Sequence, residues 1–507
     1  MAAYPAINRF WISETNNDVV AVKNFLIIVL GIALSISWFY PQQRGGVSSR
    51  PVEPVPPELS TPPPDPDPAP PAPPDDRYAT LRTLLSEAFL SPGLQGSALG
   101  FCLIDGSGKV VVGVNDETAF IPASTLKTVT TATALQRLGP DFRFFTRLLG
   151  TTPIAEGILA GDLVVEGGAD PLLAMVDLTA WALTLKERGL REVQGRIIGD
   201  GRYFKGSLFD DFWNWGDIGN GYGSAVSGLN LEHNRFTVTL VGGAASGDPA
   251  SVLSIVPEVP GVQGVNEVIT GPADSGDNVV IYGGERTGVI TLRGSVPQAK
   301  ESVILGAVPD PEGFAAYHFG LALAGAGIAV KGSAVSMNSL AGNEPPAGAE
   351  LLKHTSPPLL DLITSIHATS DNHETECLYR QLGLMEKKAP DEVIREHWKA
   401  QGLDFTGLRM EDGCGLARAN HIRPLDLARL QFLSAQGPQG AAWKGSLLAE
   451  GPVISKGGAM SSIRSSTGYI NSRSGEVFCF AFMVNHYADS QSVSHLRQAL
   501  YALVAEF

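Results

Sequence analysis

Two pairs of predicted β-strands lie near opposite ends of the chain, and they constrain the fold more than any other feature. Residues 97–115 indicate two strands around a glycine-containing turn, and residues 465–487 indicate a second such pair. Helices are predicted next to them, at 78–90 and 491–505. Because a sheet must bury one of its faces to be stable, we expect both chain ends to build one antiparallel sheet that helices cover.

The segment between these pairs changes character twice. From about residue 145 to 350 it is rich in glycine and carries short strand signals such as GDLVVEGG, NRFTVTLVGG and GVITLRGSV. This block predicts a large β-rich insertion, with a helix and a strand at 317–332. From residue 356 onward, three segments have apolar residues at helical spacing. We therefore expect one discontinuous domain, formed by 78–144 and 351–507, around an inserted region at 145–350.

The N-terminal part predicts an anchor and a spacer. Residues 22–40 carry a single charge, are almost long enough to cross about 30 Å of hydrocarbon as a helix, and end in three aromatic residues. This favours an uncleaved transmembrane helix after a short segment at 1–21, with a cleaved signal peptide as the alternative. The linker at 41–77 includes a stretch, 51–76, that holds 13 of the 35 prolines and cannot form a packed domain.

Charge and cysteine content exclude two classes of site. The net charge of −15 argues against a nucleic-acid partner, because phosphate binding needs clustered lysines and arginines. The cysteine spacing matches neither a zinc site nor a disulfide framework. We expect no metal or cofactor, and buried thiols with one oxidised pair as the alternative. The four cysteines are Cys102, Cys377, Cys414 and Cys479.

A serine lies three residues before a lysine at the start of a predicted helix. Positions three apart share a helix face, so the Lys127 amine can approach the Ser124 hydroxyl. Such a serine is either a helix cap or a nucleophile, and a nucleophilic serine needs a base. A lysine can be that base if burial and a second cation keep it neutral. No G-x-S-x-G motif is present to offer an α/β-hydrolase nucleophile instead.

Two later motifs supply partners for this pair. Ser370-Asp371-Asn372 precedes a predicted helix, where the serine hydroxyl could alternatively serve only as a cap. Lys456-Gly457-Gly458 lies on an apolar strand-like run, where glycines let a ligand's backbone lie close to the strand, although a hairpin lysine is the simpler reading. Ser-x-x-Lys, Ser-x-Asn and a lysine followed by glycine, in this order, are typical of β-lactamases and penicillin-binding proteins.

In these motifs and the sequence around them, the chain resembles the low-molecular-mass class C penicillin-binding proteins. The matching text includes STLKTVTTATALQRLGPDFRF, GDLVVEGGADPLL, SDNHETECLYRQLG, DGCGLARAN and KGGAMSSIRSSTGYI, and it covers about residue 80 to the C-terminus. The resemblance implies an α/β (α+β) fold of the serine β-lactamase/DD-peptidase type, with an antiparallel sheet flanked by helices. It also implies a serine-type D-Ala-D-Ala carboxypeptidase or endopeptidase, and the sequence leaves open which activity dominates.

The roles of the motif residues follow from the same resemblance. Ser124 would attack the carbonyl between the two terminal D-alanines, and Lys127 would take its proton. Ser370 would relay a proton to the leaving amine, and Asn372 would bind the substrate's backbone. Lys456 would hold the terminal carboxylate and help to keep Lys127 neutral.

The oxyanion hole and the substrate contacts are also implied. The backbone N–H of Ser124 would form the oxyanion hole together with that of a residue on the Lys456 strand. The substrate-binding positions implied are Gly457, Gly458, Ala459 (the second oxyanion donor), Arg418 and Asp200.

The third motif departs from the family pattern, which is usually Lys-Thr-Gly. Gly457 replaces the threonine, so a hydroxyl that helps to bind the substrate carboxylate is missing. Losing one such hydrogen bond weakens transition-state binding by roughly 1 to 3 kcal/mol. We hypothesise that Arg464, on the same segment, takes over carboxylate binding.

Two other functions are compatible with parts of this pattern. A class A β-lactamase would need an E-x-x-L-N segment, which is absent, and a shorter insertion. A peptidoglycan-binding scaffold descended from the enzymes would keep the motifs with weakened catalysis. For the enzyme, the resemblance implies peptidoglycan stem peptides as substrate, β-lactam antibiotics as covalent inhibitors, and a location in the cytoplasmic membrane with the catalytic region in the periplasm.

Overall fold

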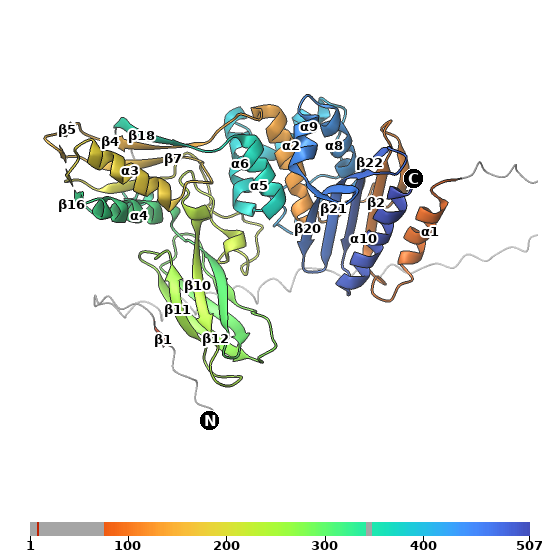
Figure 1. Ribbon diagram of the computed structural model, residues 1–507, viewed down its shortest axis with the longest axis horizontal. Coiled ribbons are helices and arrows are strands. Elements are labelled where there is room, and N and C mark those ends of the chain that lie inside the picture. The colour runs from red at the N-terminus through yellow and green to blue at the C-terminus, as the bar shows by residue number, and fades with distance from the viewer. Residues whose placement is uncertain (1–7, 10–75, 341–346) are drawn as a thin grey trace, which may run out of the picture. The chain divides into compact units, whose positions relative to one another are not determined.

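The computed structural model describes residues 8–9, 76–340 and 347–507 (Figure 1). The predicted anchor at 22–40 lies outside these residues, and so does the linker at 41–77 apart from its last two positions. No helix within the described ranges is long and apolar enough to cross a membrane.

Six antiparallel strands form the central sheet, in the order β19-β20-β21-β22-β2-β3. The two predicted strand pairs meet inside it, where Ala98 of β2 pairs with Asn485 of β22. The expectation of one sheet built by both chain ends is therefore confirmed. The strands are β2 (Ala98–Ile104), β3 (Val110–Val114), β19 (Leu448–Glu450), β20 (Val453–Met460), β21 (Ile463–Asn471) and β22 (Val477–Asn485).

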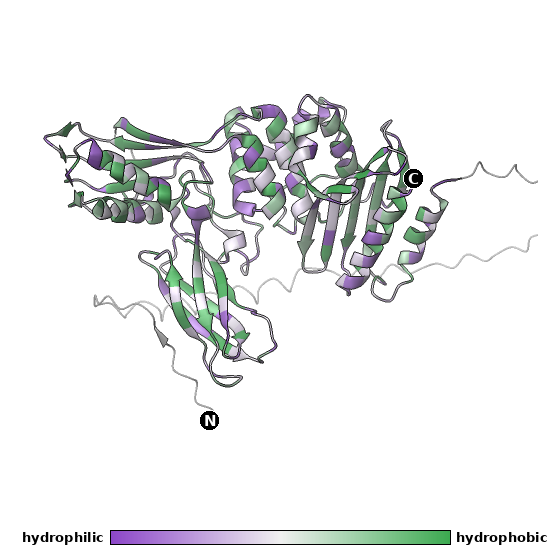
Figure 2. Cartoon of the chain, in the orientation of Figure 1, coloured by the Kyte–Doolittle hydropathy of each residue, from purple (hydrophilic) through white to green (hydrophobic). Residues whose placement is uncertain are grey.

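Side chains alternate between the two faces of this sheet because the strand period is two. On β22, Phe480 and Phe482 belong to one hydrophobic core, and Cys479 and Ala481 belong to another. The colouring of Figure 2 shows how hydrophobic these strands are. Burial on both faces explains why the strands appear in the sequence as nearly continuous apolar runs.

Helices complete both cores. The first core contains residues of α1 (Ala79–Ala88) and α10 (Ser490–Ala505), as predicted. The second is built around a helix group in which α8 packs directly on the sheet. The seven-residue α9 was not predicted, because its two glycines weaken the helical pattern. The group consists of α2 (Lys127–Leu138), α5 (Leu359–Thr369), α6 (Asn372–Glu386), α7 (Pro390–Lys399), α8 (Pro424–Gln436) and α9 (Gly440–Ser446).

The inserted region leaves and re-enters the central domain through two paired strands. β4 (Phe145–Gly150) and β18 (Ala349–Thr355) are antiparallel neighbours in a sheet of order β17-β9-β7-β4-β18. α4 (Pro311–Gly325) packs on β9 and β17 of this sheet and against α3 (Met175–Glu187). The helix α3 was not predicted, although Leu178, Trp181, Ala182 and Leu185 have helical spacing, because the surrounding glycine-rich strands dominated the pattern.

The remaining strands of the inserted region form three further small sheets, with orders β16-β8-β6-β5, β11-β10-β15 and β1-β12-β14-β13, and the last of these includes β1 from the N-terminal part of the chain. All the quoted strand signals correspond to strands. Their bounds are β1 (Asn8–Arg9), β5 (Ile154–Ala155), β6 (Ile158–Leu159), β7 (Leu163–Gly168), β8 (Glu192–Val193), β9 (Ile197–Asp200), β10 (Arg235–Val241), β11 (Ser251–Val256), β12 (Gln263–Gly271), β13 (Val280–Tyr282), β14 (Val289–Pro297), β15 (Glu301–Ala307), β16 (Ala329–Val330) and β17 (Ala334–Ser336).

The cysteines are all free and buried, which confirms the expectation of buried thiols. Cys102 and Cys479 lie on the adjacent strands β2 and β22. Burial raises the pKa of both thiols, because removal from water disfavours the thiolate.

Candidate active site

Ser124 lies in a short 3₁₀ turn, η1 (Ala123–Leu126), that runs directly into α2. The residues at the two cap positions are Pro122 and Leu126, and neither makes a side-chain cap. The Ser124 hydroxyl instead lies 3.0 Å from the Nζ atom of Lys127. The helix-cap interpretation of Ser124 is therefore wrong, and its hydroxyl is left beside an amine at the first turn of the helix.

Lys127 is completely buried and has three polar neighbours. Its Nζ atom lies within hydrogen-bond distance of Ser124 Oγ, and it donates to Asn372 Oδ1 at 2.6 Å and to the carbonyl oxygen of Cys414 at 2.7 Å. Burial lowers the pKa of Lys127, against the attraction of nearby acidic groups such as Asp412. A buried lysine with a lowered pKa can be neutral, which is the form that accepts a proton.

Ser370 and Lys456 form the second half of the cluster. Ser370 has a left-handed backbone (φ 60°) between α5 and α6, and its hydroxyl accepts a hydrogen bond from Lys456 Nζ at 2.8 Å. The cap of α6 is the carboxylate of Asp371, which accepts from the Glu374 N–H at 2.9 Å. The interpretation of Ser370 as a helix cap is therefore also wrong.

The positive charge of Lys127 affects the protonation of Lys456. Burial, and then repulsion from Lys127, lower the pKa of Lys456 to about 7. For Lys127 the main cause of the lowered pKa is burial itself. Lys456 is not among the main causes of the lowered pKa of Lys127, so the expectation that it helps to keep Lys127 neutral stays a prediction.

Strand β20 passes directly beside Ser124. A Cβ atom added at Gly458 would lie 2.9 Å from both the Ser124 backbone nitrogen and the Pro122 carbonyl oxygen, so only glycine fits. At Gly457 the nearest atom to an added Cβ is 4.0 Å away, so a side chain has room there. Ala459 is exposed on the same strand and pairs with Arg464 of β21. The strand thus lies directly beside the backbone N–H group of Ser124.

Three other predicted residues lie in exposed positions or contact other partners. Arg418 is exposed in the loop before α8. Arg464 is half-buried, and its guanidinium lies 3.4 Å from the Ile463 carbonyl oxygen. Asp200 ends β9 of the inserted region, and both of its carboxylate oxygens bind Arg202. The structure therefore brings the five predicted catalytic residues together, whereas the carboxylate of Asp200 binds Arg202.

The sequence interpretation missed several groups that support the cluster. The carbonyl oxygen of Tyr222 accepts from Asn372 Nδ2 at 2.8 Å, and that of Cys414 accepts from Lys127. Glu376, buried on α6, accepts from the N–H groups of Gly413 and Cys414 at 2.7 Å each. Burial, and then Asp412, raise the pKa of Glu376 to about 8. Backbone carbonyls leave no side-chain signature, whereas Glu376 could have been noticed one helical turn after Asn372.

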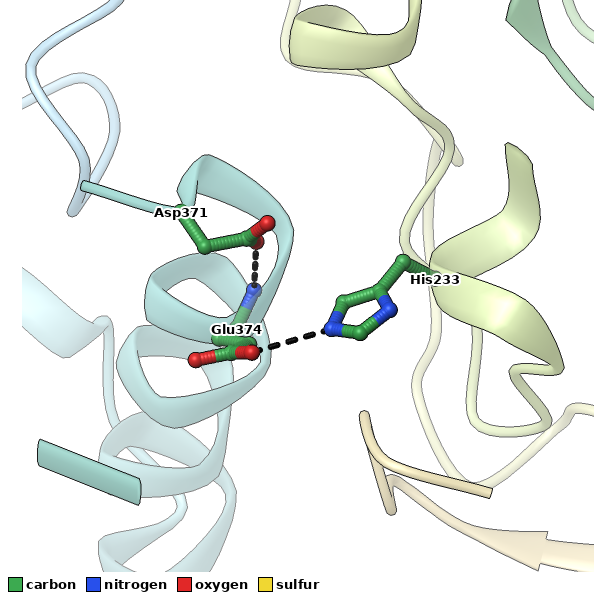
Figure 3. Close-up of side chains that lie close together, drawn as sticks. All are labelled: His233, Asp371 and Glu374. Carbon is green, nitrogen blue, oxygen red and sulfur yellow. Dashed lines mark hydrogen bonds and ion pairs between the residues drawn. The ribbon is translucent and has the colours of Figure 1, made fainter. Parts of the chain in front are cut away.

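An ion-pair cluster connects the Ser370 turn to the inserted region (Figure 3). His233 Nε2 lies 2.9 Å from Glu374 Oε1, and Asp371 accepts from the Glu374 backbone. Asp371 also pairs with Arg235 of β10 at 2.7 Å. These groups could in principle ligate a cation, but Arg235 already supplies the positive charge at Asp371, and the arrangement fits an ion-pair network.

Comparisons with known proteins agree with this geometry. The sequence model of the D-Ala-D-Ala carboxypeptidase 3 (S13) family matches residues 81–507. A D-alanyl-D-alanine carboxypeptidase from an Actinomadura strain is 27% identical over an alignment of 469 positions that covers 85% of this chain and 85% of that protein. D-alanyl-D-alanine carboxypeptidase DacB from Haemophilus influenzae is 26% identical over an alignment of 438 positions that covers 80% of this chain and 89% of that protein.

A solved structure shares the fold. The crystal structure of penicillin binding protein 4 from Haemophilus influenzae matches with a TM-score of 0.75 at 22% identity, and covers 83% of this chain and 99% of that one. A second structure of the same protein, in complex with a β-lactam, matches with a TM-score of 0.70. The mixed α/β architecture of the described residues is thus that of a penicillin-binding protein of this type.

Proposed function

The chain belongs to the D-Ala-D-Ala carboxypeptidase 3 (S13) family, and we propose that it cleaves the terminal D-Ala-D-Ala bond of peptidoglycan stem peptides through an acyl-enzyme on Ser124. It is thus a serine-type D-Ala-D-Ala carboxypeptidase and a penicillin-binding protein. The assignment of Ser124 as the nucleophile rests on the hydrogen-bonded group around it. Residues from three distant stretches, at 124–127, 370–372 and 456, meet there.

Acylation begins with the neutral amine of Lys127, which takes the proton of the Ser124 hydroxyl. The Ser124 oxygen then forms a bond to the carbonyl carbon between the two D-alanines. The N–H groups of Ser124 and Ala459 stabilise the negative charge on the carbonyl oxygen. Collapse of this intermediate breaks the C–N bond and leaves the shortened peptide as an ester on Ser124.

The departing D-alanine needs a proton on its amine and a cation at its carboxylate. Ser370, whose hydroxyl accepts a hydrogen bond from Lys456, can relay to this amine the proton that Lys127 took from Ser124, which leaves Lys127 neutral again. Lys456 binds the carboxylate when it is charged, and Asn372 orients the substrate's backbone. Water then hydrolyses the ester, with Lys127 as the base.

We expect the pH profile to separate the two lysines. A lysine is charged below its pKa, so the pKa of Lys456, about 7, means that the free enzyme loses carboxylate binding as pH rises through neutrality. A bound carboxylate favours the charged form and moves this loss to higher pH. The alkaline limb of kcat/KM should therefore lie near pH 7 to 8, and that of kcat about one unit higher. A substrate with a C-terminal amide that keeps the same alkaline limb would contradict this assignment.

The acyl-enzyme itself can be observed directly. Incubation with benzylpenicillin should add the mass of the intact antibiotic to the peptide that contains Ser124, as seen by mass spectrometry. A diacyl-D-Ala-D-Ala peptide should release free D-alanine, and penicillin should block the release. Folded protein that carries no adduct and releases no D-alanine would overturn the proposed function.

The glycine at 457 favours one alternative, a catalytically weakened peptidoglycan-binding scaffold of the same family. Gly457→Thr tests it, because a side chain has room at this position and the hydroxyl can donate to the substrate carboxylate. We expect kcat/KM to rise about 10-fold, the equivalent of one good hydrogen bond. Gly457→Val has a similar shape without the hydroxyl and should give no gain. If wild-type protein binds muropeptides without turnover, the scaffold function is correct.

The half-buried Arg464 is the residue that we propose compensates for Gly457. It lies across from Ala459 in the β20–β21 pair, on the strand next to Lys456. We therefore expect the benefit of the Gly457→Thr hydroxyl to be larger when Arg464 is replaced by alanine than in the wild-type background.

We also propose a membrane location with the catalytic region outside the cytoplasm, where its substrate lies. Support comes from the sequence alone, namely the apolar stretch at 22–40 and the proline-rich linker after it. The full-length protein should sediment with membranes and need detergent for release. A mature N-terminus located after residue 40 would show that the stretch is a cleaved signal.

A further inference from the structure

The inserted region holds the turn that carries Ser370 and Asn372. Every residue from 371 to 374 makes a side-chain contact with the segment from 222 to 235 of the insertion. The left-handed backbone of Ser370 is thus followed by four anchored positions. The contacts are Asp371 with Arg235, Asn372 with the Tyr222 carbonyl, His373 with Asn230, and Glu374 with His233.

Arg235 is the central member of this set. Its Nη1 atom donates to Asp371 Oδ2 at 2.7 Å, and its Nε atom donates to the Gly221 carbonyl at 2.6 Å. The next carbonyl along the chain, that of Tyr222, accepts from Asn372 Nδ2 at 2.8 Å. The contacts close a ring that runs from Arg235 through Asp371 and Asn372 to Tyr222, Gly221 and back to Arg235.

This ring fixes which end of the Asn372 amide faces Lys127. A side-chain amide has one donor end and one acceptor end. With Nδ2 bound to the Tyr222 carbonyl, Oδ1 is turned to Lys127, which donates to it at 2.6 Å. A displaced Tyr222 carbonyl would free the amide to rotate and to present its donor end to Lys127 instead.

Arg235 also offsets a negative charge near Lys127. Burial alone would raise the pKa of Asp371, but Arg235 and His233 lower it to about 2, so the carboxylate is ionised. That carboxylate in turn favours the charged form of Lys127. The groups that act on the pKa of Lys127 are Asp371 at the N-cap of α6, Glu376 on α6, and Asp412 and Cys414 in the loop between α7 and α8. Lys127 in turn lowers the pKa of Lys456 on β20 and of His367 on α5.

We propose that Arg235 is a positioning residue for acylation: from the inserted region, it orients Asn372 toward Lys127 and offsets the charge of Asp371. The inference rests on the proposed role of Lys127 as the base. The proposal gives the inserted region a part in the chemistry. Arg235 lies outside the central domain, but it holds the turn that follows Ser370 and orients Asn372 toward the base, Lys127.

The test is the pH dependence of the acylation rate with a fluorescent penicillin in three variants. Arg235→Gln removes the main positive charge that offsets Asp371, so the acid limb should move up by about 0.5 to 1 pH unit, with a roughly 10-fold lower rate at neutral pH. Asp371→Asn keeps the helix cap, since asparagine caps as well as aspartate, and leaves Arg235 unopposed. The acid limb of the Asp371→Asn variant should therefore move to lower pH. The double variant should return the limb to its wild-type position.

The two single variants should shift the acid limb of the pH profile in opposite directions. Loss of stability alone would shift it in neither variant, so these shifts distinguish the proposed role from destabilisation. Arg235→Lys should restore part of the rate, and Arg196→Gln, which removes the exposed ion pair with Asp162 in the same region, should behave as wild type. Melting temperatures show whether each variant folds. If Arg235→Gln does not fold, the shift of the acid limb in Asp371→Asn and its reversal in the double variant test the proposal. Wild-type protein without a penicillin adduct would count against the proposed function. If penicillin labels the wild-type protein but the acid limbs of the variants do not shift, the role of Arg235 would be overturned and the proposed function would stand.

Discussion

Replacement of Ser124 by alanine is expected to abolish penicillin acylation and to lower D-alanine release by a factor on the order of a million, the usual loss for a serine nucleophile. The fold should survive the change. The Ser124 hydroxyl caps no helix, and Lys127 keeps its bonds to Asn372 and to the Cys414 carbonyl after the hydroxyl is gone. The free energy of unfolding should therefore change by no more than about 1 kcal/mol.

Gel fluorescence with labelled penicillin and calorimetry of the same sample separate these two effects. Ser86→Ala is a matched control, because Ser86 is an exposed serine on α1 whose hydroxyl only bonds to the Thr83 carbonyl. It should label at the wild-type rate. A Ser124→Ala protein that still forms a covalent adduct would show that another residue is the nucleophile.

Gly458→Ala is expected to have the second-largest effect. The added Cβ would lie 2.9 Å from the Ser124 nitrogen and from the Pro122 carbonyl oxygen, and still closer to the Ser465 hydroxyl. Either β20 or the turn that carries Ser124 must move. Because the proposed oxyanion hole lies between them, we expect acylation to slow by about 100- to 1000-fold, as for loss of an oxyanion donor. Overpacking should also lower the free energy of unfolding by about 1 to 3 kcal/mol.

Gly457→Ala provides the comparison for this prediction, one residue away on the same strand. Its Cβ finds no atom closer than 4.0 Å, so the strand has no reason to move. Its rate should fall less than about 10-fold. Equal losses in the two variants would mean that backbone flexibility, rather than the close approach of β20 to Ser124, accounts for the effect.

The sequence allowed prediction of those parts of the site that depend on local spacing. Ser124 and Lys127 are three residues apart, and helix geometry alone brings their side chains together. Ser370 and Lys456 come from distant segments, and they were predicted only because their motifs occur in a familiar order. The central sheet was predictable because both of its strand pairs are apolar on two faces.

Other parts depend on long-range geometry that no local pattern encodes. Both helix-cap alternatives were reasonable for isolated serines, but the cap of α6 is Asp371, and the hydroxyls of Ser124 and Ser370 are turned to lysines instead. The carbonyls of Tyr222 and Cys414 orient Asn372 and Lys127 without any side-chain signal. The room beside Gly457 and the crowding at Gly458 appear only when β20 lies against the Ser124 turn.

The pairing of β4 with β18 has a consequence for the order in which the chain can fold. The central sheet requires β2 to find β22, which lies roughly 390 residues further along the chain. Once the inserted sheet forms, it holds the two ends of the insertion on neighbouring strands and shortens the loop to be closed to roughly 180 residues. The saving in chain entropy is about 0.7 kcal/mol, and the search for the partner strand is shorter. Early folding of the insertion would therefore act as an intramolecular tether that speeds assembly of the catalytic sheet.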